Sequence, residues 1–158
     1  MKTTLTPLHF KKLILGFWGL YFVLVFASNL TDGLRATGFL EKSIAFASGN
    51  YDLVARVTAI YSTPAWLVAL MFVGLLVWEL LAGILFFRAW RWQNDPARAR
   101  SGSLTAFTFS IALWCAFILA DEFFIAFEVG NLESTHIRLL VAEVVCLLAV
   151  DSIANTVS

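Results

Sequence analysis

The sequence contains few of the charged residues on which soluble domains depend. Only 14% of its 158 residues are charged, whereas soluble domains contain about 25%. Its 11 basic and 11 acidic side chains cancel, so there is no basic excess of the kind that marks a nucleic-acid-binding protein. The two cysteines, Cys115 and Cys146, lie in apolar runs without the spacing of metal ligands, and we expect both to be buried apolar side chains.

Hydrophobic residues make up 60% of the chain and gather in four long runs. A mostly apolar stretch of about 18 residues or more is long enough to cross a bilayer as a helix. The alternating ten-residue segments of membrane barrels are absent. The sequence therefore predicts an all-α, four-helix transmembrane bundle that occupies residues 1–158 as a single domain. We expect the spans at about residues 13–31, 64–89, 104–127 and 136–155.

The basic residues predict the orientation of these spans. Basic side chains in short loops gather on the cytoplasmic side of a membrane protein. One side of the predicted bundle has Lys2, Lys11, Lys12, Arg88, Arg91, Arg98 and Arg100. The other side has Arg35, Lys42, Arg56 and Arg138. We therefore expect a multi-pass protein with both termini in the cytoplasm.

The first outer connection, residues 32–63, is long and has the pattern of short helices. Apolar residues recur at helical spacing at Leu53, Val54, Val57, Ile60 and Tyr61. This pattern predicts a short amphipathic helix in the outer interface or over the outer mouth of the bundle. Residues 39–47 are expected to form a second one, with Gly49 and Asn50 at the break between them. Residues 93–103 are expected to form a cytoplasmic turn.

Polar side chains gather at one depth in the outer half of the predicted bundle. The predicted cluster consists of Asn29, Asp32, Asp121, Glu122, His136, Arg138 and Glu143. His136 and Glu143 are seven residues apart, so they share a helix face. One interpretation is structural: Arg138 and Arg35 pair with these acids and hold the helices in register. The other is a pocket for a polar headgroup, a quinone, a proton or a metal ion.

Glu79 is the one charged residue within the apolar run of residues 64–87. A charge at the centre of a span costs roughly 2.5–3.5 kcal/mol, and burial favours the neutral form of a carboxyl group. Glu79 is therefore expected either to hydrogen-bond to a neighbouring span or to relay protons in transport. Gly74, Ala82 and Gly83 lie nearby and would let another helix approach closely.

Signals for metal binding and catalysis are weak. Glu133 and His136 have the Glu-x-x-His spacing of di-iron bundles, but such bundles need two copies and two further glutamates. His136 has acidic neighbours and no evident nucleophile. We expect no bound metal, no cofactor and no catalytic activity of the chain's own.

Several short motifs carry a resemblance to a known family. They are Asn29-Leu-Thr-Asp32, Pro64 with Trp66, Glu79-Leu-Leu-Ala-Gly83, Phe-Arg-Ala-Trp-Arg91, Glu122-Phe and Arg138. In these positions the chain resembles a bacterial family of predicted small integral membrane proteins of unknown function. Residues 121–128 depart from the aromatic-rich pattern of that family. The resemblance implies four spans in a bacterial inner membrane and implies no activity.

Two functions follow from these observations as expectations. The first is a small accessory subunit of a larger inner-membrane complex, such as a respiratory or other redox complex. Its partners would be the lipid bilayer and other membrane subunits or further copies of itself. The alternative is a proton-coupled transporter of small molecules or ions that uses the intramembrane carboxylates.

Overall fold

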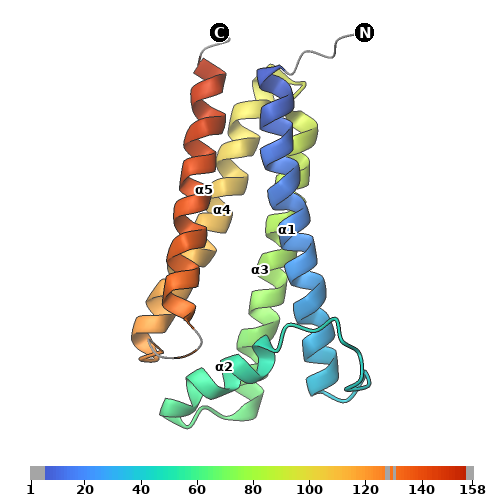
Figure 1. Cartoon of the computed structure of the whole chain (residues 1–158), viewed down its shortest axis with the longest axis vertical. Helices are drawn as coiled ribbons and strands as arrows, with labels where there is room; N and C mark the ends of the chain where they lie inside the picture. Colours follow the sequence, from blue (N-terminus) through green and yellow to red (C-terminus); the bar gives the residue numbers. More distant parts are fainter. Residues whose placement is uncertain (1–5, 127–128, 130, 156–158) are drawn as a thin grey trace.

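All regular elements of the structure are helices. It is a computed structural model that describes residues 6–126, 129 and 131–155. The elements are α1 (Pro7–Ala36), α2 (Asn50–Thr58), the 3-10 helix η1 (Ala59–Tyr61), α3 (Ala65–Trp92), α4 (Pro96–Phe123) and α5 (Leu132–Asn155). The four long helices alternate in direction, so α1 begins at the same end of the bundle at which α5 ends (Figure 1). We call this the termini end and the opposite end, where α2 lies, the α2 end.

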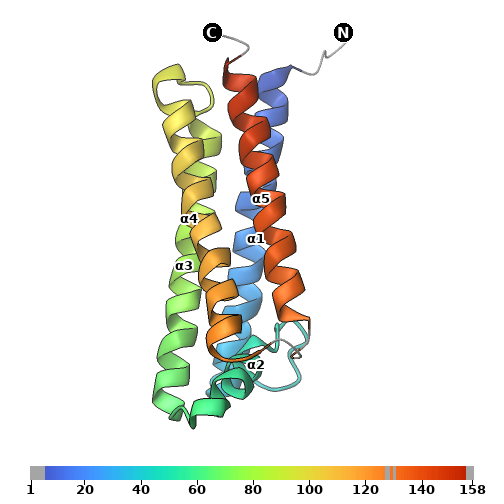
Figure 2. The ribbon, with the colours of Figure 1, turned by 90° about the vertical axis from the view of Figure 1, so that its left-hand side faces the viewer.

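The four long helices enclose a core but do not pack equally on all sides. Contacts are extensive between α1 and α3, between α3 and α4, and between α4 and α5. In contrast, α5 touches α1 at only a few positions. Figure 1 shows α1 beside α3 and α4 beside α5, and Figure 2 shows α3 beside α4. The side between α1 and α5, which we call the α1–α5 seam, is therefore the loosely packed side of the bundle.

Three helices, α1, α3 and α4, are long and apolar enough to cross a membrane. Their large apolar side chains point outward in many places, and Leu13, Leu70 and Leu119 are 69%, 59% and 69% exposed. By helix length and hydropathy the chain is a multi-pass membrane protein, and such surfaces contact the lipid bilayer. The fourth long helix, α5, has 24 residues and carries several charged side chains.

The core is built mainly from aromatic rings and small residues. Phe22 is fully buried, and its ring stacks on Phe86 at 5.8 Å and on Trp114 at 6.1 Å between centroids. Phe86 and Phe107 form an edge-to-face pair whose ring centroids are 5.0 Å apart. Offset and edge-to-face ring pairs each contribute about 0.5–1.5 kcal/mol beyond the area they bury. This cluster joins α1, α3 and α4 around one centre.

The small residues near Glu79 serve two different surfaces. Ala82 is fully buried, and a Cβ atom added at Gly83 would lie 3.3 Å from Val23 and 3.7 Å from the Gly19 carbonyl oxygen. These two positions let α1 and α3 approach closely within the bundle. Gly74 differs, because a Cβ atom there would meet nothing within 4 Å. Of the three, only Gly74 is free for a helix outside the bundle.

Three sequence predictions about local structure were wrong. Residues 39–47 form no helix. The predicted turn over residues 93–103 is mostly helical, because α4 begins at Pro96. Asp95 caps this helix by accepting a hydrogen bond from the Ala97 N–H at 3.1 Å, and proline suits the first helical position. Cys115 is exposed rather than buried.

The helix predicted from the apolar spacing at residues 53–61 is present as α2 and η1. The connection before it turns back along α1, where the Ser48 N–H donates to the Ser28 carbonyl oxygen at 3.3 Å. As a result, α2 starts beside Asn29 and packs against α1 and α3. It crosses the end of the bundle at a steep angle to the long helices (Figure 1).

Candidate functional site

A cavity of about 300 Å³ lies inside the α2 end of the bundle and is lined by all five α-helices. We call it the α2-end cavity. Its polar lining side chains are those of Tyr21, Asn50, Thr58, Glu79, Asp121, Thr135 and His136. The remaining lining residues are apolar or aromatic. Ligand sites typically have volumes of about 300–1,000 Å³ and a few polar groups in an apolar wall, so this cavity suits a small molecule.

Glu79 borders this cavity from the middle of α3. It lies fourteen residues beyond Ala65, which corresponds to about 21 Å along the helix axis. Its side chain is 3% exposed. The Asn29 amide donates from Nδ2 to Glu79 Oε1 at 2.6 Å, and Asn50 Nδ2 donates to Asn29 Oδ1 at 2.8 Å. A chain of hydrogen bonds therefore connects α2, α1 and α3.

The second carboxylate oxygen of Glu79, Oε2, has no hydrogen-bond partner among the described residues and is buried. A buried acceptor without a donor costs about 1–3 kcal/mol. Within the described ranges, no arginine or lysine lines the cavity to compensate the charge of Glu79. A donor placed in the cavity could therefore complete the hydrogen bonding of Glu79.

Asp121 and His136 form a second polar group in the wall of the cavity. His136 Nδ1 lies 2.6 Å from Asp121 Oδ2, and the two side chains connect α5 to α4. The imidazole ring stacks on Phe117 at 4.7 Å. With Asp121 ionised, the bond requires Nδ1 to carry a proton. Asp121 therefore has a donor among the described residues, whereas Glu79 Oε2 has none among them.

Glu143 lies behind the cavity wall and is fully buried between α5 and α4. Trp114 Nε1 donates to Glu143 Oε1 at 2.8 Å, and Ser110 Oγ donates to Oε2 in a short hydrogen bond. Trp114 also belongs to the cavity lining. Glu143 therefore positions an aromatic wall of the cavity without bordering it.

Asp32 holds the start of α2 in place. Its Oδ2 accepts from the backbone N–H of Tyr51 at 2.8 Å and from Ser48 Oγ at 3.4 Å. The side chain is 8% exposed. Asp32 therefore anchors the element that closes the cavity.

The structure brings together only part of the cluster predicted from the sequence. Glu79, expected to lie deeper than the outer polar groups, is joined to them through Asn29. His136 and Glu143 share a face, as their spacing predicts, and both meet α4. Glu122 is exposed and does not line the cavity. The acids thus divide into separate groups rather than forming one site.

The ion pairs predicted for the arginines are absent from the described part of the chain. Arg138 is exposed on α5, two residues from the inward-facing His136, and no described carboxylate lies within 4 Å of it. Arg35 Nε is buried without a hydrogen-bond partner in the same ranges. Instead, Asn29 donates to Glu79 Oε1, His136 pairs with Asp121, and Ser110 and Trp114 donate to Glu143. Neutral donors and an imidazole therefore take the place of the expected guanidinium groups.

Sequence reasoning missed three residues that matter to the site. Asn50 follows Gly49 and resembles a loop residue, yet it completes the chain of hydrogen bonds to Glu79. Ser110 and Trp114 both bind Glu143. They are four residues apart, which places them on one face of a helix. This spacing was a signal that α4 presents donors to a buried acid.

The site is suited to hydrogen bonding and to binding positive charge. Within the residues that the structure describes, no three His, Cys, Asp or Glu side chains lie close enough to hold a metal ion. The lining combines the carboxylate of Glu79 with the Asp121–His136 pair and contains no lysine or arginine. Such a wall attracts a cation or a neutral donor and repels an anion.

Comparisons with known proteins identify no family for this chain. No family model matches the sequence, and neither a curated protein nor a solved structure was found to be similar to it. The resemblance to a bacterial membrane family therefore stays a prediction. What the chain's own structure establishes is a small helical protein with three long apolar helices and a fourth long helix that carries more charge.

Proposed function

We propose that this protein binds a small, mainly apolar molecule that carries a protonated amine, and that Glu79 is the group that holds it. Two observations support this most: Glu79 lines the cavity, and its buried Oε2 atom lacks a hydrogen-bond partner among the described residues. An ammonium group would supply both the missing donor and the missing positive charge. Charge-assisted hydrogen bonds of this kind are roughly twice as strong as neutral ones.

The walls of the α2-end cavity support the same ligand class. Tyr21, Trp114, Phe117 and Phe124 present aromatic rings to the cavity. An aromatic face attracts a cation with about 0.5–2 kcal/mol, depending on how far the pair is removed from water. The apolar body of the ligand would be buried against α2, whose Leu53 and Val57 line the same space.

The proposed setting is a bacterial inner membrane crossed four times. In support of a fourth span, α5 has an outward apolar stripe at Ile137, Val141, Val145 and Leu148, while Glu143 points inward and is fully buried. Charged groups within spans usually face the bundle interior. The excess of basic residues at the termini end favours a cytoplasmic location for both termini, which places the cavity in the outer half.

Proton coupling is part of this proposal. An ammonium ion binds a carboxylate, whereas a proton at Glu79 removes the charge on which that binding depends. The amine and the proton therefore compete for one group, and exchange between them is the step a proton-coupled carrier of amines requires. Transport would also require α1 and α5 to move relative to each other. These two helices make few contacts along the α1–α5 seam.

Three probes of similar shape test the proposed ligand class. We expect 2-phenylethylamine to bind the purified protein about tenfold more tightly than 2-phenylethanol, because a bond to an ionised group is worth about 1.5–3 kcal/mol against about 1 for a neutral bond. The anion 3-phenylpropionate should not bind measurably. Calorimetry in detergent measures all three. Affinity for the amine should fall as the pH is lowered and Glu79 gains its proton; equal affinities for amine and anion would contradict the proposal.

A second candidate function is the accessory subunit predicted from the sequence. One observation favours it: Leu70, Val73 and Val77 are 59%, 52% and 51% exposed around Gly74, where space is open. A small residue within an apolar face lets a second membrane helix approach closely.

The accessory role predicts that Gly74→Leu abolishes association while the chain itself stays folded. Isolation in mild detergent, with cross-linking and mass measurement, detects a partner subunit or a second copy. Gly74→Ala is the matched control, because the smaller side chain should weaken association far less. A wild-type protein that is purified alone, without a partner or a second copy, would contradict the accessory role.

A further inference from the structure

The termini end of the bundle contains a second cavity, of about 680 Å³, between α1, α4 and α5. We call it the termini-end cavity. Its apolar lining includes Leu104, Leu147 and Val150. Its charged lining residues are Lys11, Arg100 and Asp151. The cavity lies on the α1–α5 seam, where α5 touches α1 at few positions, so it is placed where a lipid molecule can enter from the side.

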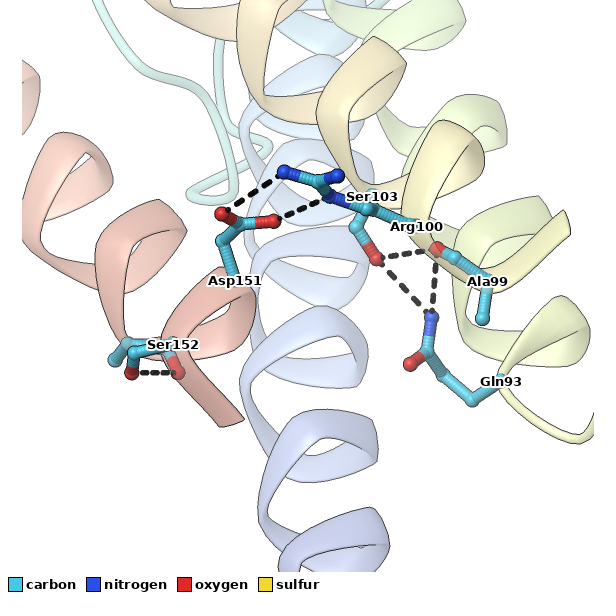
Figure 3. Close-up of polar contacts among 7 residues, drawn as sticks. Gln93, Ala99, Arg100, Ser103, Asp151 and Ser152 are labelled. Atoms are coloured by element: carbon cyan, nitrogen blue, oxygen red, sulfur yellow. Dashed lines mark hydrogen bonds and ion pairs between the residues drawn. The ribbon is translucent and has the colours of Figure 1, made fainter. Parts of the chain in front are cut away.

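The charges around this cavity favour an anion. Arg100 Nε donates to Asp151 Oδ1 at 2.8 Å and Arg100 Nη2 to Oδ2 at 3.4 Å (Figure 3). The carboxylate of Asp151 also attracts Lys11 electrostatically, although no described carboxylate lies within 4 Å of Lys11. Of the three charged side chains in the lining, two are basic and one is acidic. The lining therefore carries one surplus positive charge. The whole termini end is basic as well: its described residues include six basic side chains, Lys11, Lys12, Arg88, Arg91, Arg98 and Arg100, and two acidic ones, Asp95 and Asp151.

Polar groups beside the charges form a fixed wall. Gln93 is 8% exposed, and its Nε2 donates to the Ala89 carbonyl oxygen and to Ser103 Oγ, each at 3.0 Å. Ser103 Oγ in turn donates to the Ala99 carbonyl oxygen at 2.9 Å. Figure 3 shows Gln93 and Ser103 beside the Arg100–Asp151 pair. These bonds hold the short connection between α3 and α4 against the first turns of α4, and they leave Gln93 Oε1 as an acceptor for a hydroxyl group.

We propose that the termini-end cavity binds one phospholipid with a singly charged anionic headgroup, of the phosphatidylglycerol type. The phosphodiester lies between Lys11 and Arg100, and its single negative charge matches the surplus charge of the lining. A headgroup hydroxyl donates to Gln93 Oε1. The acyl chains follow the apolar residues of the α1–α5 seam towards the membrane centre. Basic pockets between membrane helices at the cytoplasmic side are known to suit anionic headgroups.

Native mass spectrometry of the purified full chain tests this site with defined lipids. Phosphatidylglycerol should stay bound, and phosphatidylcholine with the same acyl chains should bind about tenfold less. The double variant Lys11→Gln/Arg100→Gln should bind phosphatidylglycerol roughly thirtyfold more weakly than the wild type, since each basic side chain near an anionic lipid contributes about a fivefold gain. Lys11→Arg keeps the charge and should retain the lipid, which separates loss of binding from loss of folding.

A second double variant distinguishes a built site from general attraction. Lys12→Gln/Arg91→Gln removes the same charge from the same end, but neither residue lines the cavity. Lys12 donates instead to Asn94 Oδ1 at 2.9 Å, and Arg91 is exposed. This control should bind phosphatidylglycerol within about twofold of the wild type. An equal loss in both double variants, equal binding of the two lipids, or displacement of the lipid by free glycerol 3-phosphate would overturn the proposal.

Discussion

Replacing Glu79 by glutamine is expected to weaken amine binding by about a hundredfold. Truncating or neutralising one partner of a buried charge pair costs about 2–5 kcal/mol, and about 2.7 kcal/mol corresponds to that factor. The fold should survive, because the amide oxygen of the new side chain can accept the hydrogen bond that Asn29 now donates to Glu79 Oε1. Calorimetric titration with 2-phenylethylamine measures the change, and the melting temperature reports on folding.

The matched control for this variant is Glu122→Gln. It removes one acidic charge from the same molecule, but Glu122 is exposed and does not line the α2-end cavity. Its affinity for the amine should stay within about twofold of the wild type. If Glu79→Gln and Glu122→Gln bind the amine equally well, Glu79 is not the recognition group, and the site must be sought elsewhere.

Replacing Glu143 by alanine is expected to lower the free energy of unfolding by about 2–4 kcal/mol. The substitution leaves Trp114 Nε1 buried without its acceptor, which costs about 1–3 kcal/mol. It also leaves a void in a fully buried position, and lost packing around such a void adds about 1 kcal/mol or more. Denaturant titration in detergent, followed by circular dichroism, measures the effect.

Glutamine at the same position separates hydrogen bonding from charge. Its oxygen can accept from Trp114, and its amide can donate to Ser110, whose hydroxyl already has the Phe107 carbonyl oxygen as an acceptor at 3.1 Å. Glu143→Gln should therefore cost less than about 1 kcal/mol. If alanine and glutamine destabilise the protein equally, the carboxylate stabilises through its charge and not through the hydrogen bonds seen here.

Much of the architecture could be predicted from the sequence, because long apolar runs leave a membrane helix few alternatives. The run that contains Glu79 is α3, and the apolar spacing after residue 52 is α2 with η1. The start of α4 was missed because Ser101-Gly102-Ser103 resembles a turn. The sequence signal for this helix start is Asp95 followed by Pro96. Asp95 is a capping residue, and proline suits the first helical position.

The site was predicted less well, because depth can be estimated from sequence position but orientation cannot. Asp121 and Glu122 are neighbours, so they point about 100° apart on a helix, and only Asp121 faces inward. Arg138 lies at the right depth for an ion pair but on the exposed face of α5. The connection between α1 and α2 turns back along α1 and brings Asn50 to Asn29. No local sequence pattern predicts such a long-range contact.

Glu79 is proposed to hold a positively charged ligand inside the bundle, and a distance measurement tests this most directly. Solid-state NMR of the protein in lipid bilayers, with a ¹³C-labelled glutamate side chain and ¹⁵N-labelled 2-phenylethylamine, reports the separation between the amine nitrogen and the carboxyl carbon. Glu79→Gln identifies which signal belongs to this residue. We predict a separation of about 3–4 Å, because the nitrogen lies about 2.7–2.9 Å from the carboxylate oxygen in such a bond. Bound amine with no glutamate carboxyl carbon near its nitrogen would contradict the proposed role of Glu79.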